Sequence, residues 1–146
     1  MGGGSSGRFG NTQGGSGKTG SFTNDTPHQP TPGEWRVIND LVKKGKTIEM
    51  IPRSTTSGEG TPDMKVNGVR TEIKTLENAN TNTGMKRAKY GFNKQGAAVV
   101  IVDARGSGLS KLQARELINR LKGQYTNGRL PGRIEVWIDG GIIRYP

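Results

Sequence analysis

The pair Asn67-Gly68 constrains the fold of this chain more than any other feature. Two strand-like runs flank the pair, and Asn-Gly between such runs is the strongest short-range signal of a two-residue β-hairpin loop. A loop of that length fixes the register of the two strands, and counting outward from the turn places Asp63 opposite Glu72. Directly opposed residues on one face of a sheet have Cβ atoms roughly 5 Å apart. The sequence therefore predicts a close pair of carboxylates.

These residue types in this pattern point to phosphodiester chemistry. Two close carboxylates repel each other, and a divalent cation relieves the repulsion. Lys74 lies two residues beyond Glu72, so its side chain points to the same face of the strand. We expect Asp63 and Glu72 to hold Mg²⁺ or Mn²⁺, an ion that activates water and polarises a phosphoryl oxygen. Lys74 would position the attacking water, deprotonate it or neutralise the transition state, and the sequence leaves these roles open.

The composition favours a polyanionic partner. The 146 residues carry a formal net charge of +10, and nucleic acid is the commonest partner of such a domain. The hairpin register also places Lys65 opposite Arg70, an unfavourable pair of like charges that is understandable beside a phosphate backbone. Four more candidate phosphate contacts lie in one predicted helix, although a solvated helix face explains them equally well: Lys86, Arg87, Lys89 and Lys94.

Other residue counts exclude whole classes of function. The chain has no cysteine, which rules out disulfides, cysteine-ligated zinc and thiol chemistry. His28 is the only histidine, so a histidine metal cluster is excluded as well. No apolar run approaches the roughly 18 residues of a membrane span.

The chain divides into two parts. Residues 1–33 are rich in Gly, Ser, Thr and Asn, and we expect a flexible linker without a core. Residues 34–146 are long enough for one domain. Its expected elements, read from periodicity, caps and turn residues, are a helix over 33–44, a strand over 47–51, a hairpin over 62–76, a helix over 82–95 capped by Thr81 or Thr83, a buried strand over 97–103, a helix after a capping box at Ser110 and Gln113, and a hairpin of strands 134–138 and 142–145.

These residues resemble a known nuclease signature. Pro62-Asp63 followed by Glu72-Ile73-Lys74 is similar to the motif of the PD-(D/E)xK nuclease superfamily. The element order resembles the restriction-endonuclease-like αβββαβ core, an α/β fold, here with an added C-terminal helix and β-hairpin. Within the superfamily, residues 34–146 most resemble the C-terminal tRNA nuclease toxin domains of contact-dependent growth inhibition effectors. The stretch from Asp103 to Gly108 is also similar to those domains.

The resemblance implies further roles. Glu34, on the first helix, would complete the acidic site, although a first-turn acid that favours the helix dipole explains it equally well. The carbonyl of Ile73 would be a further metal ligand. Arg105, in the second matching stretch, joins the expected nucleic-acid contacts. The domain would leave a producer cell within a secreted effector, cleave tRNA in the target-cell cytoplasm, and be neutralised by a cognate immunity protein, expected to be acidic.

Three alternatives remain open at the level of sequence. The first is a DNA endonuclease on the same scaffold, which a comparison of DNA with total tRNA as substrate distinguishes. The second is a non-catalytic nucleic-acid-binding module, which would not need a metal. The third is a metal-free ribonuclease in which the 2′-hydroxyl of RNA is the nucleophile. The absence of a histidine outside the predicted linker counts against this last alternative.

Overall fold

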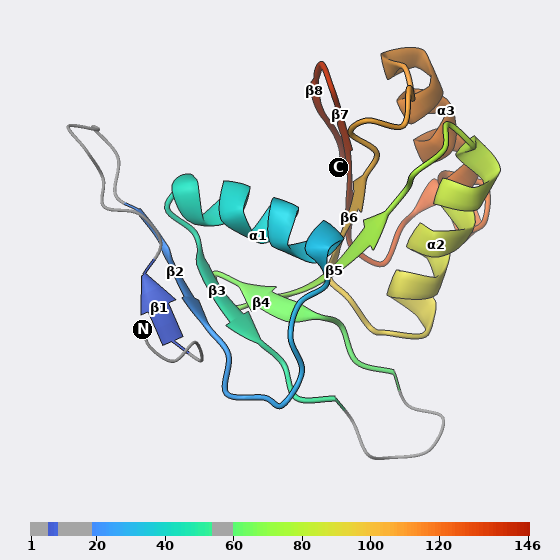
Figure 1. Cartoon of the computed structure of the whole chain (residues 1–146). Coiled ribbons are helices and arrows are strands. Elements are labelled where there is room, and N and C mark those ends of the chain that lie inside the picture. The colour runs from blue at the N-terminus through green and yellow to red at the C-terminus, as the bar shows by residue number, and fades with distance from the viewer. Residues whose placement is uncertain (1–5, 9–18, 54–59) are drawn as a thin grey trace.

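The computed structural model describes residues 6–8, 19–53 and 60–146, with the backbone alone for residues 6–8 (Figure 1). In these ranges the strands are β1 (Ser6–Arg8), β2 (Ser21–Thr23), β3 (Thr47–Met50), β4 (Met64–Val66), β5 (Val69–Thr75), β6 (Val99–Asp103), β7 (Arg133–Ile138) and β8 (Gly141–Tyr145). The helices are α1 (Pro32–Lys43), α2 (Thr81–Asn93) and α3 (Lys111–Lys122), with a 3-10 turn at Thr126–Gly128. The predicted α/β order and its C-terminal addition are confirmed.

The strands of the described residues form one mixed sheet in which they lie side by side in sequence order, from β1 to β8. The pairs β2–β3, β5–β6 and β6–β7 are parallel, and the other neighbouring pairs are antiparallel. Helices α1, α2 and α3 supply the three parallel crossovers. The predicted register of the β4–β5 hairpin is confirmed, because Val66 pairs with Val69, and Met64 with Thr71.

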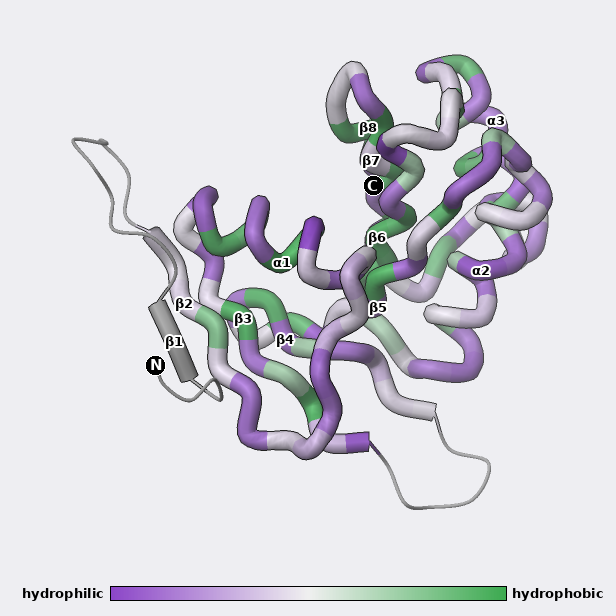
Figure 2. The backbone as a smooth tube through the Cα atoms, in the orientation of Figure 1, coloured by the Kyte–Doolittle hydropathy of each residue, from purple (hydrophilic) through white to green (hydrophobic). Residues whose placement is uncertain are grey.

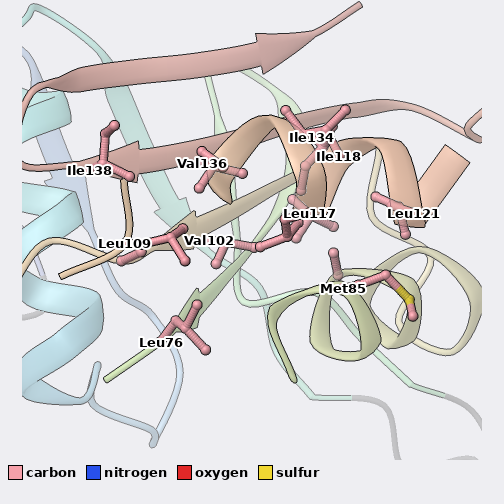
Figure 3. Close-up of a cluster of buried hydrophobic side chains, with 14 of the residues drawn as sticks. Leu76, Met85, Val102, Leu109, Leu117, Ile118, Leu121, Ile134, Val136 and Ile138 are labelled. Carbon is pink, nitrogen blue, oxygen red and sulfur yellow. The ribbon is translucent and has the colours of Figure 1, made fainter. Parts of the chain in front are cut away.

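The two faces of the sheet are covered at opposite ends. Helix α1 packs its apolar residues on the β2–β5 end of one face, and Ile73 and Trp137 point into this first core. Helices α2 and α3 cover the other face over β5–β8, where Val102, Leu117 and Val136 lie in the second core (Figures 1 and 3). The hydrophobic stretches in Figure 2 follow the strands and the inner sides of the helices. On this second face, no described helix covers β3 and β4, so the sheet surface beside α2 is open.

The N-terminal cap of α2 differs from the prediction. Asn80 caps the helix, because its side-chain oxygen accepts a hydrogen bond of 2.9 Å from the amide of Thr83. The threonines at 81 and 83, which we expected to provide the cap, lie inside the helix. Asn is among the best cap residues, so the helix begins one residue after it. At α3 the predicted capping box of Ser110 and Gln113 is confirmed.

The predicted linker over residues 1–33 differs from the structure in its described C-terminal part. Strand β2 pairs in parallel with β3. Phe22 is 2% exposed in the first core, with its ring centroid 4.8 Å from that of Trp35. A single aromatic side chain between polar neighbours supplies enough apolar surface to attach this short strand. Residues 1–5 and 9–18 lie outside the described part of the chain, so the linker prediction stands untested there.

In the described residues, none of the helices has the length and hydropathy that crossing a lipid bilayer requires.

Candidate active site

The two predicted carboxylates lie together at the open end of the β4–β5 hairpin. Asp63 immediately precedes β4, and its amide donates a hydrogen bond of 3.0 Å to Oε1 of Glu72. In return, Oδ2 of Asp63 accepts a hydrogen bond of 2.9 Å from the amide of Ile73. Each side chain therefore bonds the backbone of the opposite strand and continues the hairpin by one step. This reciprocal contact fixes both carboxylates within the same small volume.

Lys74 completes the predicted constellation. Its Nζ lies 3.1 Å from Oε2 of Glu72, and the Glu72 side chain is only 4% exposed, against 19% for that of Lys74. Nζ also lies 5.2 Å from the ring centroid of Tyr90, on α2. The lysine is thus held between a buried carboxylate and an aromatic ring, with its ammonium still reached by solvent.

Burial makes this acidic pair costly to ionise. Burial is the main cause that raises the pKa of Asp63 to about 8, and the negative charges of Glu72 and Glu34 raise it further. Burial also raises the pKa of Glu72, whereas Lys74, the amide of Asp63 and the side chain of Gln95 oppose that rise. A bound cation would reverse this preference, because it stabilises the charged forms.

Glu34 serves the helix and also lies near the pair. Its Oε1 accepts a hydrogen bond of 3.0 Å from the amide of Thr31, and the Thr31 hydroxyl accepts one of 3.2 Å from the amide of Glu34. This capping box is the structural role that the sequence left open. The same carboxylate is close enough to raise the pKa of Asp63, so the N-terminus of α1 contributes negative charge to the site.

The donor set fits a hard divalent cation bound by two carboxylates. The described residues contain no cluster of three or more His, Cys, Asp or Glu side chains close enough to hold a metal ion together. Mg²⁺ commonly binds proteins through one or two carboxylates and keeps several waters or substrate oxygens. Asp63 and Glu72 meet that requirement, and Glu34 does not complete a third ligand position. Ile73 gives its amide to Asp63, and its side chain is buried under α1.

The predicted phosphate contacts separate into two groups. Lys65 and Arg70 pair across the hairpin on the sheet face of Glu72, and Lys86 on α2 and Lys94 just after it are exposed. The other three are occupied by contacts within the protein. Arg87 donates to the carbonyl of Thr75, Lys89 donates to Gln124 over 2.9 Å, and Arg105 binds Asp103 and Asp40.

Arg105 lies away from the acidic pair. Its guanidinium is 4.8 Å from the ring centroid of Trp137, and its Nε lies 2.8 Å from Oδ1 of the buried Asp103. Hydrogen bonds to the carboxylates of Asp103 and Asp40 raise the pKa of the guanidinium above its ordinary value. Arg105 ties α1 to the carboxyl end of β6, so the structure gives this residue a structural role.

Two residues near the pair are not among the site residues that the sequence predicts. Gln95, just after α2, hydrogen-bonds with Glu72, and its Oε1 is a buried atom without a partner among the described residues. It lines a cavity of about 520 Å³ whose walls also include Thr61, Arg70 and Lys94. Tyr90 is 54% exposed beside Lys74. The sequence signal for the tyrosine is an aromatic ring at a spacing of four residues from both Lys86 and Lys94.

A family model matches the part of the chain that contains the acidic pair. The model described as the contact-dependent growth inhibition CdiA C-terminal domain matches residues 59–143. This chain belongs to that family. The match begins just before Asp63 and runs through β4 to β8, so it includes Glu72 and Lys74, whereas Glu34 lies outside it.

A solved structure has the same fold as this CdiA C-terminal domain. It is the CdiA-CT/CdiI toxin and immunity complex from Burkholderia pseudomallei, with a TM-score of 0.53 and 16% sequence identity. The likeness covers 85% of this chain and 97% of the other. No curated protein matches the sequence. The predicted relation to the toxin domains of contact-dependent growth inhibition is therefore confirmed at the level of the family.

Proposed function

We propose that this CdiA C-terminal domain is a metal-dependent nuclease that cleaves phosphodiester bonds in tRNA. The observation that carries the proposal is the reciprocal hydrogen bonding of Asp63 and Glu72, with Lys74 on Glu72. The net charge of +10 and the exposed cations beside the pair support a polyanionic substrate. The spacing and order of these residues support membership of the PD-(D/E)xK superfamily.

In the proposed reaction, the carboxylates bind the metal ion and the lysine acts on the water and the phosphate. Asp63 and Glu72 would hold Mg²⁺ or Mn²⁺, which would supply an activated water and charge neutralisation at the phosphoryl group. Lys74 holds its ammonium on the substrate side of Glu72, where it orients the attacking water and stabilises the negative charge that develops on the phosphate. The ion pair with the buried Glu72 carboxylate holds Nζ of Lys74 in position. Gln95 holds the Glu72 carboxylate in place from the side of α2.

The biological setting follows from the family. We propose that the domain is delivered from a producer cell as part of a larger secreted effector and acts in the cytoplasm of the target cell. The solved relative was captured with an immunity protein. A cognate immunity protein for this chain would meet a strongly basic surface, so we expect an acidic partner that covers the acidic pair and its cations.

One experiment tests the proposal directly. The purified chain is incubated with total tRNA or with plasmid DNA, in Mg²⁺ or in EDTA, and the products are separated on gels. We expect cleavage of tRNA that requires Mg²⁺ and is absent from Asp63→Ala and Glu72→Ala. Cleavage of DNA alone would select a DNA endonuclease on the same fold. Binding without any cleavage would select the non-catalytic module.

A further inference from the structure

Tyr90 is an exposed aromatic side chain directly beside the candidate active site. The side chain is 54% exposed, and among the described residues only Val69 and Leu112 are other large hydrophobic side chains that are comparably open. Its ring is the group that Nζ of Lys74 contacts, at 5.2 Å, while the same Nζ binds Glu72 at 3.1 Å. Only the Lys74 side chain separates this aromatic ring from Glu72. The ring is therefore positioned to contact the nucleotide next to a phosphate bound at the acidic pair.

The flanking cations follow the spacing of the helix. Lys86 on α2 and Lys94, the C-cap residue of that helix, lie four residues before and after Tyr90, so they are its neighbours on one side of the helix. Neither forms an ion pair with a described carboxylate. The face therefore presents an aromatic ring between two uncompensated positive charges. A charged backbone with aromatic bases is the ligand that such a face suits best.

A cavity continues this face toward the sheet. Lys94 lines a space of about 520 Å³ together with Arg70 and Gln95, and Gln95 contacts Glu72. The volume falls within the range of small-ligand pockets and is sufficient for a nucleotide. Arg70 is also without a carboxylate partner among the described residues. A strand that crosses the acidic pair would thus meet a positively charged pocket that Gln95 connects to the pair.

We propose that the substrate enters this site as an unpaired segment, with a base stacked on Tyr90 and the adjoining phosphate in the pocket of Arg70 and Lys94. The inference rests on the proposed function and adds the substrate class to it. In a duplex, each base is stacked on its neighbours and its face is closed to a protein ring. A single strand, a loop or a frayed end leaves that face open. A helix with one exposed ring selects among these substrates by stacking, without reading a sequence.

The test measures stacking separately from cleavage. The full chain is titrated in EDTA into a short single-stranded RNA with 2-aminopurine at one position, and into the same strand annealed to its complement. We expect strong fluorescence quenching and tight binding for the single strand alone. Tyr90→Ala should weaken single-strand binding about 5- to 150-fold and remove the quenching, whereas Tyr90→Phe should keep both. Leu112→Ala, an exposed apolar residue on α3, and Lys111→Ala serve as matched controls with no effect.

Two results would overturn the inference: duplex bound as tightly as single strand, or Tyr90→Ala that binds and quenches as the wild type does. Failure of the proposed function looks different. If the chain quenches the probe through Tyr90 but cleaves no nucleic acid in Mg²⁺, the substrate class stands and the nuclease assignment fails. If tRNA is cleaved and Tyr90→Ala has wild-type affinity and turnover, the nuclease stands and the stacking role fails.

Discussion

Asp63 is the residue of the candidate site whose ionisation costs the most free energy in the metal-free protein. The carboxylate is partly shielded from water and lies near the negative charges of Glu72 and Glu34, and together these effects raise its pKa to about 8. Both carboxylates accept a hydrogen bond from a backbone amide, so the unfavourable contribution to stability comes from their negative charge. Such groups mark functional sites more often than structural ones, because a protein that needs only stability would carry a neutral residue there.

The substitution Asp63→Asn should stabilise the metal-free protein at pH 7. Asp63 is protonated in the folded state and ionised in the unfolded state, where its pKa is near 3.8, so stability falls as pH rises from about 4 to about 8. Asparagine removes this penalty and keeps an oxygen for the amide of Ile73. We expect thermal unfolding in EDTA to show a Tm higher by at least about 3 °C, roughly 1 kcal/mol. The exposed Asp25→Asn should have no effect.

Bound metal should stabilise the wild type and not the Asp63→Asn variant. Mg²⁺ should raise the Tm of the wild type and leave that of Asp63→Asn unchanged, because the ion needs the charged carboxylate. A variant that responds to Mg²⁺ as the wild type does would show that the ion binds elsewhere.

Lys74 and Lys86 should differ in the kinetic quantity that they control. Lys74→Ala removes the ammonium beside Glu72, and we expect turnover at saturating tRNA to fall by at least about 100-fold. Lys86→Ala removes an exposed charge on α2, which should weaken binding and reduce the salt slope by about 1 while keeping turnover. Single-turnover cleavage over a series of salt concentrations separates the two. If Lys86→Ala lost turnover and Lys74→Ala kept it, the assignment of the catalytic face to β5 would be wrong.

At the scale of elements, the β4–β5 hairpin was predictable and the helix beside it was only partly so. Asn67-Gly68 determines the register through local backbone geometry, which is why the pairing of Asp63 with Glu72 could be derived without a structure. The positions of Tyr90 and Gln95 depend on how α2 is rotated against β5. That rotation is decided by packing between segments far apart in sequence, so no local pattern reports it.

Gly91 brings α2 close to the acidic pair. A Cβ at this position would lie 2.9 Å from Cγ2 of Val100 and 3.4 Å from Cγ of Glu72. Gly91→Ala should therefore push the helix away from β5. We expect a net loss of about 1–2 kcal/mol of stability in urea unfolding, after the gain in helix propensity, together with reduced turnover.

Gly84→Ala is the matched control for Gly91→Ala. Its Cβ would lie 2.5 Å from Cδ1 of Leu117, on the α3 side and away from the pair. Gly84→Ala should lower the free energy of unfolding and leave the turnover of tRNA cleavage unchanged. Equal turnover in both variants would show that the close approach of α2 does not position Glu72.

For the whole molecule, the main difference from the sequence-based picture is the extent of the domain. The predicted boundary at residue 33 came from composition, and a three-residue strand with one buried aromatic residue does not change composition enough to be detected. The helices, the hairpins and the strand of residues 99–103 were predictable because their periodicity is long and local. Strand β2 is held by contacts with β3 and α1, which are formed only in the folded chain.

Phe22→Ala should test whether this extension belongs to the domain. The side chain is 2% exposed, so its removal should destabilise the protein by about 3–5 kcal/mol in urea unfolding. Ser21→Ala, on the same strand but only half-buried, should have little effect. An unchanged midpoint for Phe22→Ala would mean that the N-terminal strands detach in solution and that the domain begins with α1.

The sequential order of the strands has a consequence for folding kinetics. In the described sheet, each strand lies beside the one that precedes it in the chain, so no strand has to wait for a distant segment before it can add. The antiparallel hairpins close short loops, whereas each parallel pair has to close a helical crossover, so we expect the hairpins to form before the parallel pairs. The β4–β5 hairpin offers a local nucleus from which the sheet can extend in both directions.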